Sequence, residues 1–108
     1  MPIALTPNET WNYTLKDDPV KTVFKLKSLD GEERETYMDS GLLARVLVRL
    51  TLRGWDLRDA AGQEIKFLTD AEGRCDRINL GYLSTAAVYE LAGAVREHEK
   101  PSEGERKN

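Results

Sequence analysis

The spacing of apolar residues changes repeatedly along this 108-residue chain, and these changes constrain its fold more than any other feature. Apolar residues first recur at every second position, then at helical spacing, and after Gly54 they alternate again before a last helical segment. Period-two alternation is typical of half-buried strands, and recurrence at i, i+3, i+4 and i+7 is typical of amphipathic helices. The pattern therefore predicts an α+β fold.

Two alternating runs predict an N-terminal β-hairpin. Trp11, Tyr13 and Leu15 alternate with polar residues, and a second alternating run extends from Val20 to Leu26. The sequence KDDP at 16–19 is a turn signal between them. Because an isolated hairpin is marginally stable in water, its apolar face is expected to pack against helices.

A central helical region with a break near Gly41 is expected next. Asp30 can cap a first helix that runs to about residue 38, and Glu33 stands where a capping box places its partner. Asp39 or Ser40 can then cap a second helix, which follows the break.

The second helix carries an apolar face. That face is expected to contain Leu42, Leu43, Val46, Leu47 and Leu50. Gly54 is expected to end the helix, because glycine adopts positive φ at little cost. Trp55, just beyond it, is expected to fold back on the last turn and close the end of the apolar face.

The remaining residues predict a small second hairpin, a loop and a last helix. Segment 55–67 alternates on both sides of the sequence DAAG at 59–62, which suits a type I turn with a glycine bulge. Residues 68–82 predict a polar loop with short helical turns, and Ser84 can cap the final helix. We expect a single domain over residues 1–100, followed by a disordered charged tail at 101–108 that is dispensable for folding.

Composition disfavours several classes of protein. The formal net charge is −3, whereas nucleic-acid-binding domains are usually basic, so nucleic-acid binding is not expected. The single cysteine cannot form a disulfide within the chain. Neither a signal peptide nor an apolar run long enough to span a bilayer is visible. A cytoplasmic protein without membrane association is therefore expected.

No catalytic, cofactor or metal site is expected. His98, the one histidine, is interpreted as a cation favourably placed near a helix C-terminus. Cys75 has arginines nearby but no histidine close in sequence, so it is interpreted as incidental. One cysteine and one histidine cannot supply a zinc site.

Arg45, Arg49 and Arg53 are spaced four residues apart along the expected second helix and are the candidate partner-binding residues. They could contact phosphates or an acidic partner helix. The favoured alternative is a solvated flank whose aliphatic stems cover the apolar face. The residues expected to be structural are Trp11, Leu47, Leu50, Trp55 and Leu91.

A family resemblance is carried by short segments in a fixed order. They are PNETWNY at 7–13, TVFKL at 22–26, GEERE at 31–35, LRGW at 52–55, DAAG at 59–62, IKF at 65–67 and the leucine-rich helix at 83–95. Their order and texture resemble the tail assembly chaperones of long-tailed bacteriophages and prophages.

The resemblance implies a non-enzymatic assembly factor. Such a factor binds the tape-measure protein, keeps its long apolar helix soluble and recruits subunits of the major tail protein, and self-association is expected of it. Two other functions stay open: a structural virion component, such as a minor tail or head–tail connector protein, and a small regulator that binds nucleic acid through its arginines. An enzyme is the least expected function.

Overall fold

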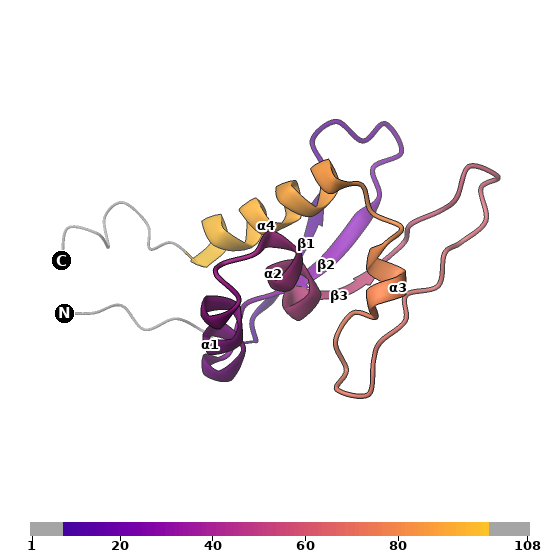
Figure 1. Cartoon of the computed structure of the whole chain (residues 1–108). Coiled ribbons are helices and arrows are strands. Elements are labelled where there is room, and N and C mark those ends of the chain that lie inside the picture. Colours follow the sequence, from indigo (N-terminus) through magenta and orange to yellow (C-terminus); the bar gives the residue numbers. More distant parts are fainter. Residues whose placement is uncertain (1–7, 100–108) are drawn as a thin grey trace.

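A computed structural model describes residues 8–99 of the chain. Within that range it has a three-stranded antiparallel sheet of order β1-β2-β3 and four helices (Figure 1). The elements are β1 (Thr10–Thr14), β2 (Val23–Lys27), α1 (Gly31–Asp39), α2 (Ala44–Thr51), β3 (Leu52–Trp55), α3 (Arg77–Leu80) and α4 (Thr85–Glu99). The predicted α+β class is confirmed. The expected tail at 101–108 lies outside the described residues.

The N-terminal hairpin is confirmed, with a longer turn than expected. β1 and β2 pair in antiparallel register, with Tyr13 opposite Phe24. The Asp18 carboxylate accepts hydrogen bonds from the backbone N–H groups of Val20 (2.9 Å) and Thr22 (2.8 Å). These bonds hold Val20 in the turn, where it is 71% exposed, so the second strand begins at Val23 and not at Val20.

Helix α1 begins as the sequence predicts. The Asp30 side chain accepts a hydrogen bond from the backbone N–H of Glu33 at 2.8 Å, and Glu33 accepts one from the backbone N–H of Asp30 at 3.1 Å. This reciprocal pair is a capping box, which satisfies two backbone donors at the helix start.

The end of α1 turns the chain through two residues with positive φ, Gly41 (φ 82°) and Leu42 (φ 64°). The Gly41 N–H donates to the carbonyl of Met38 at 3.0 Å, and the Leu42 N–H donates to that of Tyr37 at 3.2 Å. These two bonds form a Schellman motif, which ends a helix sharply. Ser40 is the C-terminal cap of α1.

Helix α2 starts later than the sequence suggests. Its N-cap is Leu43, which makes no side-chain capping bond. The prediction that Asp39 or Ser40 caps this helix is wrong, because both residues belong to the C-terminal end of α1. Leu42 and Leu43 consequently lie outside the helix, and the prediction that they share its buried face is wrong.

Helix α2 passes into β3 without a connecting loop. The helix ends at Thr51, and Leu52 already has extended backbone angles. Gly54 lies within β3 opposite Lys25, next to a bulge that leaves Arg53 as the extra residue. The prediction that Gly54 ends the helix is wrong, because pairing with the edge of β2 satisfies the backbone groups of this segment.

The second hairpin is confirmed as a short one. Arg58 and Glu64 form an isolated antiparallel bridge, and the Ile65 N–H donates to the Leu57 carbonyl at 2.9 Å. Asp59 accepts bonds from backbone N–H groups inside the turn, and Gly62 has φ 82°, as a glycine bulge requires.

Trp55 joins β3 to this hairpin. Its ring meets Phe24 and Phe67 edge-on, with centroids 6.4 and 5.0 Å apart, and its Nε1–H donates to the Ile65 carbonyl at 2.6 Å. The prediction that Trp55 follows a helix-ending glycine and folds back on the last turn of α2 is wrong, because Trp55 belongs to β3. Trp55 stands on a strand that places its ring against the hairpin.

The predicted loop at 68–82 contains the short helix α3 and an isolated β-bridge. Asp76 caps α3, accepting bonds from the backbone N–H groups of Ile78 (2.9 Å) and Asn79 (3.3 Å). Asn79 is buried, and its side chain accepts a bond from the Leu68 N–H at 2.5 Å and donates to the Lys66 carbonyl at 3.1 Å. One buried amide therefore fixes the second hairpin to α3.

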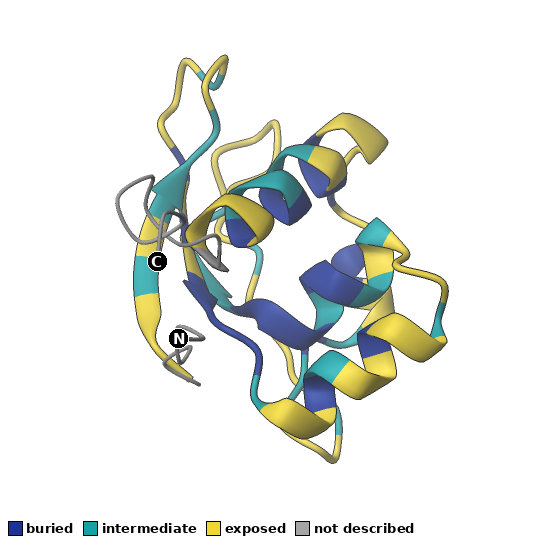
Figure 2. Ribbon diagram, turned by 90° about the vertical axis from the view of Figure 1, so that its left-hand side faces the viewer, coloured by how far each residue is buried: buried dark blue, intermediate teal, exposed yellow. Residues whose placement is uncertain are grey.

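The final helix and the core follow the predicted pattern. Ser84 Oγ accepts a bond from the Ala87 N–H at 3.1 Å at the start of α4. Helices α2 and α4 cover one face of the sheet, and the buried surfaces face one another (Figure 2). The most deeply buried large apolar side chains are those of Phe24, Leu26, Leu29, Leu47, Val48, Leu50, Leu52, Leu80, Leu91 and Val95. Trp11 and Trp55 are half-buried at the core margin.

A buried ion network links β2, α1 and β3. Lys27 pairs with Glu33, and their side chains are only 7% and 6% exposed. Glu33 Oε2 also lies 3.3 Å from Nη2 of Arg53. Lys27 Nζ donates to Asn8 Oδ1 at 2.7 Å and to the Ser28 carbonyl at 3.0 Å. The charges removed from water are thereby paired and hydrogen-bonded, as burial requires.

Glu33→Gln tests this network. The substitution keeps the size of the side chain but leaves Lys27 buried without its counterion. We expect the free energy of unfolding to fall by about 3–5 kcal/mol in urea denaturation. The control is Glu32→Gln at the exposed neighbour, which should change it by no more than about 0.5 kcal/mol. An equal change in the free energy of unfolding for the two variants would contradict a stabilising role for the ion network.

Trp55→Ala removes two ring contacts and one hydrogen bond at the β3 end. We expect it to lower the free energy of unfolding by about 3 kcal/mol or more, as for other large aromatic residues packed on a core. Trp55→Phe keeps an aromatic ring and should lose less. Urea melts followed by circular dichroism measure both, and an unchanged melt for Trp55→Ala would refute the assigned role.

Candidate protein-binding surface

The three candidate arginines do not form a continuous stripe. Arg49 Nη2 lies 2.9 Å from Asp70 Oδ2, and Arg53 stands on β3, where it pairs with Glu33. Arg45 alone of the three is exposed. The prediction that they share one helix flank is therefore wrong for Arg53. Their role in partner binding stays a prediction, and of the three Arg45 is the one most accessible to a partner.

Asp70 holds Arg49 against a tight turn. Its carboxylate accepts hydrogen bonds from the backbone N–H groups of Glu72 (2.8 Å) and Arg74 (3.1 Å). The bond from the Arg74 backbone is the main reason that the pKa of Asp70 is lowered, and Arg49 adds to the effect. Asp70 therefore remains charged and fixes one of the candidate arginines to the protein itself.

His98 lies in the last turn of α4, as expected, and stacks on Trp11. The two ring centroids are 3.6 Å apart at an interplanar angle of 11°, and His98 Nε2 lies 3.1 Å from Glu9 Oε1. This places the N-terminal strand against the C-terminal helix. His98 therefore packs against the N-terminal strand, beside an open groove between β1 and α4.

That groove has a volume of about 630 Å³ and is lined by Trp11, Tyr13, Lys16, Glu90, Gly93, Ala94, Glu97 and His98. The Tyr13 hydroxyl donates to Glu90 Oε2 at 2.8 Å, and the backbone N–H of Lys16 donates to the same oxygen at 2.8 Å. Burial, together with the Glu90 carboxylate, raises the pKa of Tyr13 to about 12. Tyr13 therefore stays protonated and ties β1 to α4.

Cys75 is fully buried. Burial raises the pKa of its thiol to about 11, although Arg49 and Arg53 oppose the shift. A thiolate is the reactive form of cysteine, and this environment disfavours it. The sequence predicts an incidental cysteine in a loop at Cys75, and the structure instead places its side chain in the core.

Residues 8–99 bring no three histidine, cysteine or acidic side chains together in a way that could hold a metal ion. In the same range, no helix is both long and apolar enough to cross a membrane.

A cluster of exposed apolar side chains lies where α1, α2 and α4 meet. The exposed fractions are 62% for Met38, 54% for Leu42, 56% for Leu43 and 63% for Tyr89. We call this cluster, with the two hollows beside it, the α2–α4 face. Its side chains come from the end of α1, the link to α2 and the first half of α4. They join into an apolar surface that the fold leaves open.

The two hollows lie on either side of the Leu42–Leu43 link. One has a volume of about 290 Å³ and is lined by Leu43, Ala44, Arg45, Thr85, Val88 and Tyr89. The other has about 260 Å³ and is lined by Leu29, Arg34, Tyr37, Met38, Leu42, Leu47, Val95 and Arg96. Both are lined mainly by apolar side chains, which suits the insertion of apolar side chains from a partner.

The link is held in its exposed position by backbone geometry. Leu42 has φ 64°, which is uncommon for a bulky residue other than glycine and costs free energy. From α4, Arg96 Nε donates to the Tyr37 hydroxyl at 2.9 Å, and its Nη2 donates to the Leu42 carbonyl at 3.4 Å. Strained residues of this kind are concentrated at functional sites.

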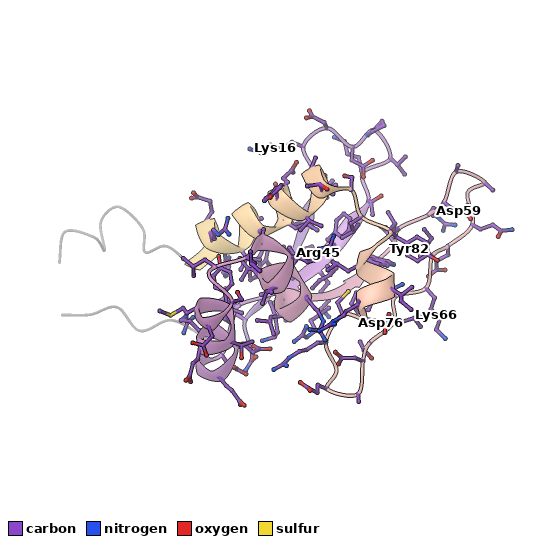
Figure 3. All side chains as sticks on the ribbon, in the orientation of Figure 1. Lys16, Arg45, Asp59, Lys66, Asp76 and Tyr82 are labelled. Carbon is purple, nitrogen blue, oxygen red and sulfur yellow. The ribbon has the colours of Figure 1, made fainter. Side chains whose placement is uncertain are left out.

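A second exposed apolar group surrounds α3. Leu68, Ile78 and Tyr82 are 47%, 81% and 59% exposed. They lie by a hollow of about 400 Å³ that also contains Asp59, Glu64 and Lys66. Figure 3 labels Asp59, Lys66 and Tyr82 at this end of the molecule and Arg45 beside α2. This second surface has mixed charges, unlike the α2–α4 face.

Sequence reasoning missed the α2–α4 face because helical spacing assigned Leu42 and Leu43 to the core. The available signal was Gly41 after a capped nine-residue helix, since a glycine there can form a Schellman turn and release the next residues from the helix. Comparison with known protein families, curated proteins and solved structures finds no match to this chain. Its function is therefore inferred from its own residues.

The state of Cys75 can be measured directly. We expect the native protein at pH 8 to react with Ellman's reagent at least about a hundredfold more slowly than the urea-unfolded protein, because the thiol is buried and its pKa is about 11. The control is a Cys75→Ala variant, which should give no signal. Rapid stoichiometric labelling of the native protein would contradict an inert core cysteine.

Proposed function

We propose that this chain is a tail assembly chaperone of a long-tailed bacteriophage or prophage, which binds the tape-measure protein and recruits tail-tube subunits without catalysing a reaction. The resemblance of the segments between residues 7 and 95 supplies the family and its client, and the structural observation that supports the proposal is the α2–α4 face, where Leu42 and Leu43 are more than half exposed. A fold that exposes two adjacent leucines, one of them with a strained backbone, is well suited to hold apolar segments of another protein.

The form of the surface supports a helical client. A helix that lies in a groove inserts apolar side chains at spacings of three, four and seven residues. Val88 and Val95 line different hollows of the α2–α4 face and are two turns apart on α4. A long apolar helix, such as that of a tape-measure protein, can insert side chains into both hollows.

The other two functions have less support. A nucleic-acid regulator would use the candidate arginines, yet Arg49 and Arg53 are paired with Asp70 and Glu33. A structural virion component would use similar apolar surfaces but would remain in the assembled tail. Mass spectrometry of purified tails separates this alternative, because a chaperone should be absent from them.

Co-expression tests the proposal. The tape-measure protein of the same phage or prophage should remain soluble when it is produced with this chain and precipitate without it. Leu43→Ser should weaken the complex by about tenfold, because it removes exposed apolar area from the binding surface. The matched control is Ile78→Ser, at an apolar residue that is 81% exposed near α3. Precipitation of the tape-measure protein in both the presence and the absence of the chain would refute the proposal.

A further inference from the structure

The charged residues that line the two hollows of the α2–α4 face are of one sign. Among the described residues that line its two hollows, Arg34, Arg45 and Arg96 are basic and none is acidic. The groove between β1 and α4 contains Glu90 and Glu97 as well as Lys16, and the α3 hollow contains Asp59 and Glu64 as well as Lys66, so both have mixed charges. The formal net charge of the chain is −3. The positive rim is thus a local feature that the overall composition does not explain.

Two of these arginines can present charge to a partner. Arg45 is exposed and lies beside Leu43 at one hollow. Arg96 lines the other hollow, and the groups that its guanidinium contacts, the Tyr37 hydroxyl and the Leu42 carbonyl, are neutral. The Tyr37 ring also lies 5.9 Å from the guanidinium carbon. These contacts orient Arg96 without neutralising its charge.

We propose that the α2–α4 face binds an amphipathic helix whose apolar stripe is flanked by carboxylates. This inference rests on the proposed function and specifies the chemistry of the client segment. Its apolar residues enter the two hollows, and its Asp or Glu side chains meet Arg45 and Arg96. Complementary charge of this kind sets the orientation of a partner and discriminates against basic sequences.

The positions of Val88 and Val95 on α4 set the expected spacing of the partner's apolar residues. Val88 and Val95 lie on α4, one at each hollow, and a separation of seven residues along a helix corresponds to about 10 Å. A partner helix that runs beside α4 places residues i and i+7 at that separation. The Leu42–Leu43 link lies between the hollows and contacts the small or apolar residues between these two anchors.

The test compares two fluorescein-labelled helical peptides with identical leucines at i, i+3, i+4 and i+7. One carries Glu at the flanking positions and the other carries Lys. Fluorescence anisotropy with the full chain at low salt should give about tenfold tighter binding for the Glu peptide, and the difference should shrink as salt screens the exposed charges. A third peptide, with the leucines moved off this spacing, should lose binding.

Arg45→Glu supplies the decisive variant. Arg45 is exposed, so the variant should melt like the parent protein and should narrow or reverse the preference between the two peptides. The charge-matched control, Arg77→Glu at an exposed position of α3, should preserve the preference. Equal binding of the two peptides, tighter binding of the Lys peptide, or displacement of the Glu peptide by a short DNA oligonucleotide would overturn the inference.

The outcomes also separate this inference from the proposed function. If the chain keeps the tape-measure protein soluble but does not distinguish the peptides, the charge inference fails and the chaperone proposal stands. If the Glu peptide binds as expected while the tape-measure protein precipitates regardless, the chaperone proposal fails and the acidic-helix site stands.

Discussion

Glu33 holds three elements of the fold together through one buried carboxylate. It completes the capping box of α1, neutralises the buried Lys27 of β2 and pairs with Arg53 of β3. Burial of an ammonium group is costly unless it is paired and hydrogen-bonded, so these elements must assemble around one carboxylate. Because the same network fixes α1 against the sheet, it also fixes the direction in which α1 delivers the chain to the exposed link.

The α2–α4 face depends on this arrangement. Helix α1 ends in a Schellman motif, which turns Leu42 and Leu43 outward, and Arg96 on α4 contacts the carbonyl of Leu42. Apolar side chains that a core would normally contain are therefore held in solvent by backbone hydrogen bonds. Rigid display of this kind lowers the entropy that a binding surface loses when a partner docks.

The elements that local chemistry determines could be predicted from the sequence. The capping box at Asp30, the glycine bulge at Gly62 and the Ser84 cap are each specified by neighbouring residues. The helix that continues into β3 could not be predicted, because the edge of β2 decides the conformation of 52–55 and lies far away in sequence. For the same reason the arginines at 45, 49 and 53 were expected on one flank, whereas pairing with distant carboxylates decides which of them reaches solvent.

The direct passage from α2 to β3 makes the helix and the strand one uninterrupted segment of regular structure. No loop separates the helix from the strand, and Leu43 and Trp55 lie at opposite ends of this single segment. Trp55 is hydrogen-bonded to the second hairpin, which a buried amide ties to α3. The second hairpin and α3 are therefore positioned relative to α2 by one uninterrupted stretch of backbone and by these hydrogen bonds, without a loop between α2 and β3.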